Sequence, residues 1–146
     1  MKPALIDDIL RFIREHGTAK LKATDEATLR DWIPRMAAHD YLFRIADEGK
    51  TVALGIGWPC RRAEPLQPIP EGRFATVIYV ANLCASNGDA LRWLLVEAGR
   101  RWPCAGRYIA QRTPKRLRHD AAVEGNWTYY TPHDMDRLHR FACVNA

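Results

Sequence analysis

The chain has 146 residues, of which 47% are hydrophobic and 27% charged, and its formal net charge at pH 7 is +5. This length suits one domain, and the hydrophobic content excludes a chain that is disordered over most of its length. No apolar run approaches the roughly 18 residues that a membrane-spanning helix needs, and the N-terminal segment lacks the uninterrupted apolar core of a signal peptide. We therefore expect a single domain over residues 1–146, located in the cytoplasm and without a membrane span.

The first half of the chain changes from a helical to an alternating apolar pattern near Tyr41. We expect an N-terminal helix over 3–16, closed by Gly17, and a second helix capped by Thr24 and kinked or broken at Pro34. A hairpin follows, and its second strand contains Gly55 and Gly57, which indicate a bulge or a close backbone approach. The proline-rich residues 59–72 are predicted to form an extended loop.

In the second half, strands alternate with helices. The predicted elements, in order, are a central strand over 74–83, a turn over 86–89, a helix from Ala90 to Trp102, a strand over 107–111, a helix from Pro114 to about Val123, a strand over 127–131 and a C-terminal helix over 133–146. The central strand is apolar nearly throughout, which is typical of a strand buried on both faces. Helices that alternate with strands after an initial hairpin predict a mixed α/β sheet.

This order resembles the GNAT-type N-acyltransferases, in which two helices precede a hairpin and a helix begins where the central strand splays from its neighbour. The segments Lys22–Leu29 and Tyr41–Gly55 are similar to the family's first helix and hairpin, and the resemblance covers roughly residues 20–131. Asn87–Leu91 also resembles the toxin-activating lysine acyltransferases, which take their acyl group from an acyl carrier protein. The resemblance implies a GNAT-like fold with a splayed central strand and transfer of an acyl group to an amine.

The turn after the central strand is where this family binds acetyl-CoA or another acyl donor. Family members usually carry an Arg/Gln-x-x-Gly-x-Gly/Ala loop there, whose backbone N–H groups hold the pyrophosphate. This chain has a single glycine in the turn, and Asp89 places a negative charge beside the expected phosphates. The residues that the resemblance assigns to the cofactor are Cys84, Ser86, Asn87, Gly88, Arg112 and Arg116.

The candidate catalytic residues are His119, Tyr79 and Asn82. His119 follows the predicted strand over 107–111, where the family usually keeps a tyrosine that protonates the leaving thiolate, and an imidazole can serve as acid or base. Tyr79 and Asn82 are polar positions on the central strand, and each also suits a purely structural role. The sequence has four cysteines and no CxxC motif, so we expect reduced, buried thiols and no metal site.

Seven basic residues and no acidic residue fall within residues 100–118, and we call this segment the basic cluster. It indicates an anionic donor or an acidic carrier protein as partner, and nucleic acid is a further option. Three hypotheses stay open. They are a GNAT-like acyltransferase, a GNAT-fold binding or assembly protein without catalysis (a virion or complex component, for example), and a nucleic-acid-associated protein.

Overall fold

The structure is a computed structural model, and it describes residues 1–69, 75, 77–102, 108–111, 122–124 and 127–130. The helices are α1 (Pro3–His16), α2 (Ala19–Ala23), α3 (Glu26–Ala38) and α4 (Gly88–Arg101). The strands are β1 (Leu42–Asp47), β2 (Lys50–Arg61), β3 (Glu64–Pro68), β4 (Val77–Ala85), β5 (Tyr108–Gln111), β6 (Ala122–Glu124) and β7 (Trp127–Tyr130). The expected mixed α/β fold is confirmed.

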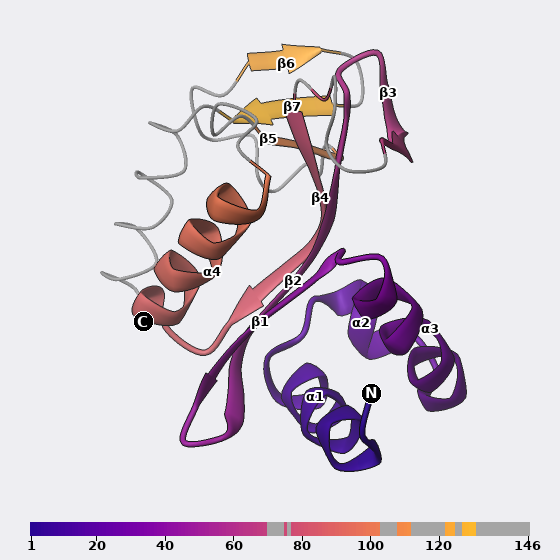
Figure 1. The fold of residues 1–146 in the computed structure, drawn as a ribbon, viewed down its shortest axis with the longest axis vertical. Helices are drawn as coiled ribbons and strands as arrows, with labels where there is room; N and C mark the ends of the chain where they lie inside the picture. The colour runs from indigo at the N-terminus through magenta and orange to yellow at the C-terminus, as the bar shows by residue number, and fades with distance from the viewer. Residues whose placement is uncertain (70–74, 76, 103–107, 112–121, 125–126, 131–146) are drawn as a thin grey trace.

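The seven strands form one sheet in the order β1-β2-β4-β5-β7-β6, and β3 pairs with β2 outside this path. All strand pairs are antiparallel except β4 with β5. Figure 1 shows β2 and β4 as two long neighbouring strands that run through the molecule, with α4 on one face and α1, α2 and α3 on the other. A strand so placed must be apolar on both sides, which agrees with the sequence of β4.

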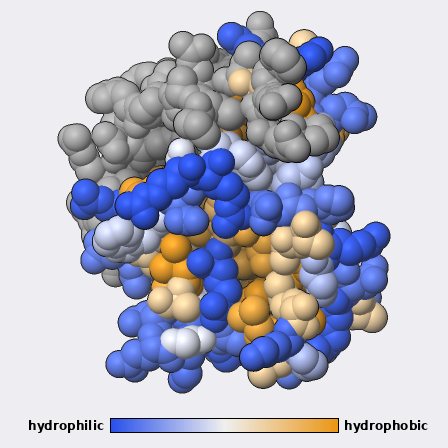
Figure 2. Space-filling view, viewed as in Figure 1, coloured by the Kyte–Doolittle hydropathy of each residue, from blue (hydrophilic) through white to orange (hydrophobic). Residues whose placement is uncertain are grey.

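Each face of the sheet carries its own hydrophobic core. On one face α4 buries Ala90, Leu94 and Ala98 against Phe43 of β1 and Ile78 of β4. On the other face α1, α2 and α3 pack against β2 and β4. The buried residues of this second core are Ile9, Leu10, Phe12, Ile13, Leu21, Leu29, Ile33, Leu54 and Cys84. Figure 2 shows polar residues over much of the described surface, with apolar residues visible between α4 and α1.

The N-terminal helices differ from the sequence prediction in two respects, the helix over residues 19–23 and the cap of the helix that follows. Residues 19–23 form the short helix α2, which Thr18 caps by accepting a hydrogen bond from the Leu21 N–H at 3.3 Å. The cap of the next helix is Asp25 and not Thr24, because the Asp25 carboxylate accepts the Thr28 N–H at 3.0 Å. This helix continues unbroken through Pro34. Proline removes one backbone donor, and burial of Leu29 and Ile33 holds the helix together despite that loss.

Two further predictions are wrong, because segments predicted as a loop and as the end of a helix form strands. Residues 59–72 do not form one loop, because β2 continues to Arg61 and residues 64–68 form β3. Proline lacks the N–H but keeps its carbonyl, and the Pro59 carbonyl accepts a hydrogen bond from the Ile69 N–H at 2.9 Å. The helix predicted to reach Val123 is also wrong at its end, since residues 122–124 pair with β7 as strand β6. The C-terminal helix predicted over 133–146 lies outside the described residues.

Candidate functional site

The central feature of the sheet is the point where β4 and β5 separate. The two strands run parallel, and the described residues pair at Ile78 with Tyr108 and at Tyr79 with Ile109. Beyond these pairs β4 continues to Ala85 beside β2, while β5 stays paired with β7 through Gln111. Over the described residues, the pairing of the two strands therefore ends at Tyr79 and Ile109. We call the region between β4 and β5 beyond this point the β4–β5 slot.

A bulge in β4 lies directly beside the slot. Ile56 of β2 pairs with Asn82, whereas the next residue, Gly57, pairs with Val80, so that Ala81 is the extra residue. A Cβ atom at Gly57 would lie 2.5 Å from the backbone oxygen of Tyr79. The predicted close approach at Gly57 is confirmed, and it explains why a glycine is needed there.

Tyr79 packs into an aromatic cluster on the face of the sheet opposite α4. Its ring centroid lies 4.9 Å from that of Trp58, and only 7% of the residue is exposed. Burial, and to a smaller extent the neighbouring Cys60, raise the pKa of the Tyr79 hydroxyl. The phenol therefore remains protonated at neutral pH, which is the state that a proton donor requires.

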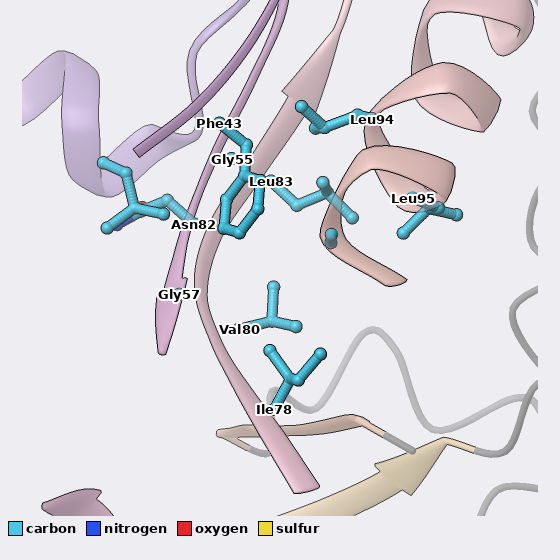
Figure 3. A pocket seen from close by; sticks show the side chains of 11 residues that line it. Phe43, Gly55, Gly57, Ile78, Val80, Asn82, Leu83, Leu94 and Leu95 are labelled. Atoms are coloured by element: carbon cyan, nitrogen blue, oxygen red, sulfur yellow. The ribbon is translucent and has the colours of Figure 1, made fainter. Parts of the chain in front are cut away.

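Asn82 points away from α4, as Figure 3 shows. Its side-chain oxygen accepts a hydrogen bond from the Thr18 hydroxyl at 3.2 Å, and the residue is 6% exposed. Sequence reasoning missed Thr18, because the contact joins residues 64 positions apart and Thr18 by itself is an ordinary helix cap. Tyr79 and Asn82 thus share the face that carries α2, on either side of the bulge.

A small cavity of about 30 Å³ lies on the other face of β4, between the sheet and α4. Figure 3 shows Leu83 on the same side as Leu94 and Leu95 of α4, opposite to Asn82. The lining residues are Phe43, Gly55, Ile56, Gly57, Ile78, Val80, Asn82, Leu83, Leu94, Leu95 and Ala98. A cavity of this size has room for one or two water molecules or a comparably small apolar group.

The turn between β4 and α4 holds three of the residues that the sequence assigned to a cofactor. Asn87 caps α4 by accepting the Ala90 N–H at 2.8 Å, and its amide nitrogen donates to the Ser86 hydroxyl at 3.3 Å. The Ser86 hydroxyl and backbone N–H both donate to the Val52 carbonyl, at 3.1 and 2.8 Å. Gly88 is buried at the first helical position, and the acidic Asp89 follows it. The side chains of this turn bind its own backbone and that of β2.

Cys84 lies apart from that turn, in the core between the sheet and the N-terminal helices. Its thiol donates to the Leu54 carbonyl at 3.7 Å, and burial raises its pKa to about 11. The thiol is therefore neutral at physiological pH and a poor nucleophile. Cys60 is also buried, which agrees with the prediction of buried cysteines for these two positions. Among the described side chains, no three His, Cys, Asp or Glu residues gather as metal ligands would.

The remaining candidates lie largely outside the described residues. This holds for His119, Arg112 and Arg116, and for all of the basic cluster except Arg100 and Arg101. Arg101 donates to the backbone oxygens of Asp40 and Leu42 at 2.7 and 2.9 Å, and its guanidinium lies 4.0 Å from the centre of the Phe43 ring. Arg101 thus binds the exposed edge of β1, which leaves Arg100 as the exposed member of the cluster in the described part of the chain.

No family model, no curated protein and no solved structure matches the chain. None of the helices that the structure describes is long and apolar enough to cross a lipid bilayer.

Proposed function

We propose that the chain is a GNAT-like N-acyltransferase that takes an acyl thioester into the β4–β5 slot and transfers the acyl group to an amine. The observation that carries the proposal is the separation of the two parallel strands directly after Tyr79 and Ile109. No residue of β4 beyond Tyr79 is in register with the described part of β5, and in this proposal an extended ligand lies along β4 there. A helix also begins at the end of β4, as the family resemblance requires.

In this proposal Tyr79 is the acid. The amine nitrogen attacks the thioester carbonyl carbon, the carbon–sulfur bond breaks, and the departing thiolate takes the proton of the Tyr79 hydroxyl. The proton lost by the amine passes to water, because the described part of β4 carries no carboxylate, and the Tyr79 phenolate regains a proton from solvent. The raised pKa of Tyr79 keeps its proton in place until the thiolate forms.

The acyl donor that we favour is acetyl-CoA, because it is the donor that the family resemblance implies.

A transfer assay tests the proposal. The chain is incubated with acetyl-CoA and a panel of primary amines, and release of free CoA is followed by a thiol reagent against a control without amine. We expect amine-dependent release that Tyr79→Phe lowers about a hundredfold, within the range usual for general acids. Tyr41→Phe is a matched control, since Tyr41 also packs against Trp58 but lies outside β4. Absence of release with every amine, or an unchanged rate in Tyr79→Phe, would contradict the assignment.

A second candidate function is binding without catalysis on the same fold. It is favoured by the β4–α4 turn, where Asn87 accepts the Ala90 N–H, Ser86 donates to the Val52 carbonyl, and the charge of Asp89 would repel a phosphate. This candidate predicts that the chain binds an acyl thioester or CoA and releases no product with any amine. Binding and turnover measured on one preparation separate the two functions.

A further inference from the structure

The outward face of α4 carries large apolar side chains that the sheet does not cover. Trp93 is 57% exposed and Val96 is 38% exposed, and both project from the helix whose opposite side is buried. They are three residues apart, so they lie on one face, nearly one turn from each other. Tryptophan is among the residues that are enriched at the centre of protein interfaces.

Charged residues surround this apolar pair in a definite order. Asp89 lies four residues before Trp93, Arg100 lies four residues after Val96, and Arg92 and Glu97 lie next to the pair, so that the charges alternate in sign along the face. Asp89, Arg92 and Arg100 make no ion pair with any described side chain, and Glu97 pairs with Arg101 only at 3.8 Å. The face therefore holds opposite charges at its two ends that are available to a partner.

This arrangement complements itself under a two-fold rotation. Consider two α4 helices that pack antiparallel, with the two-fold axis level with the midpoint between Leu94 and Leu95. Trp93 of each copy then lies opposite Val96 of the other. The same axis places Asp89 opposite Arg100 and Arg92 opposite Glu97. Asp89 and Arg100 are separated by about 16 Å along the helix, at 1.5 Å a residue, so the contact spans three turns. Such an interface is isologous, because each pair of residues occurs twice.

We propose that α4 forms a symmetric, antiparallel dimer contact with α4 of a second copy of this chain. The charges decide the occupant, because a partner helix of one charge sign meets like charges at two of these four positions. A second copy packed antiparallel presents the opposite sign at all four of them. Three helical turns make a smaller contact than the roughly 1,600 Å² of a standard interface. We therefore expect a weak dimer that dissociates on dilution. This contact is independent of the proposed transfer reaction, because it uses the side of α4 that faces away from β4.

The test is sedimentation of the full chain over a wide range of concentration, with variants of the face. We expect the dissociation constant of the dimer to rise about thirtyfold in Trp93→Ser, as for loss of a central interface residue. Leu66→Ser is the matched control, since Leu66 is 61% exposed on β3 and lies outside the proposed contact, so its dimerisation should equal that of the wild type.

Charge reversal tests the register. Asp89→Arg and Arg100→Asp each place like charges opposite one another and weaken the dimer, whereas the double variant restores both pairs and returns the dissociation constant towards the wild-type value. Thermal unfolding verifies that each variant is folded, and Asp89→Asn replaces Asp89→Arg if the reversal disturbs the first turn of α4. A wild-type chain that stays monomeric at every concentration, a Trp93→Ser variant that dimerises as well as the wild type, or a double variant as weak as the single ones overturns the proposal.

Discussion

Asp8 of α1 and Thr51 of β2 are joined by two hydrogen bonds, from the Thr51 backbone N–H at 2.8 Å and from its hydroxyl at 2.5 Å. Arg11 and Arg44 also donate to this carboxylate, at 2.9 and 3.1 Å. Four donors thus converge on one half-buried side chain, and they fasten the N-terminal helix to the end of the hairpin. The contact links α1 to the sheet on the face that carries Tyr79 and Asn82.

Loss of the Asp8 charge should destabilise the fold. Asp8→Asn removes an ionised acceptor from these donors, and hydrogen bonds to charged groups contribute roughly 1.5–3 kcal/mol each. We expect the free energy of unfolding, measured by urea denaturation, to fall by about 2 kcal/mol. Asp7→Asn is the matched control, because Asp7 binds Arg30 on the exposed surface, where ion pairs contribute little. An equal loss in both variants would show that the Asp8 cluster has no special role.

The same cluster predicts acid sensitivity. Burial by itself raises the pKa of Asp8, but the hydrogen bonds from Thr51, Arg11 and Arg44 outweigh it and hold the pKa well below its usual range. The stabilisation is therefore fully present above the unfolded pKa of about 4, and it decreases by up to roughly 1.4 kcal/mol for each pH unit below that value. We expect the difference in stability between wild type and Asp8→Asn to narrow between pH 5 and pH 3. A difference that stays constant over this range would contradict the assigned pKa.

Gly57 should tolerate no side chain. In Gly57→Ala the new Cβ would lie 2.5 Å from the Tyr79 backbone oxygen, so the bulge of β4 must shift. We expect a loss of about 2 kcal/mol in the free energy of unfolding, which is typical of overpacking. Gly55→Ala is the comparison, because its Cβ would meet the flexible end of Leu94 at 3.1 Å, and its loss should be smaller. The reverse order of the two losses would exclude the bulge as the reason for Gly57.

The cap of α4 should contribute a measurable part of the stability. Asn87→Ala leaves the Ala90 N–H without its acceptor, which costs about 1 kcal/mol in comparable helices. Asn87→Ser retains a capping oxygen and should remain close to the wild type in thermal unfolding. If both variants melt alike, the side-chain cap seen at Asn87 is not what holds the start of the helix.

Much of the fold follows from sequence patterns that act over short distances. The helix over Pro3–His16 and the hairpin of β1 with β2 are set by apolar periodicity and turn residues, and Gly57 already indicated the close approach at the bulge. Strand β3 was missed because its prolines suggest a loop, whereas its pairing with β2 depends on a partner elsewhere in the chain. The neighbours of Tyr79 and Asn82 could not be predicted for the same reason, since Trp58 and Thr18 reach them only through the fold.

The role of Tyr79 as an acid has a consequence for the pH profile of transfer. Because its pKa is raised, the wild-type rate should persist into alkaline solution and fall only where the phenol loses its proton. Tyr79→Phe should show a low rate without this alkaline decline, and circular dichroism should show an unchanged fold. An identical decline in both proteins would assign it to another group.

Direct titration of the full chain with acetyl-CoA tests the central claim, that the slot between β4 and β5 takes an acyl thioester. We predict saturable binding of one ligand per chain, with an increase of several degrees in the melting temperature at saturating ligand, as binding to the folded state requires. Absence of any binding heat and of any thermal shift at millimolar acetyl-CoA would contradict the proposed function.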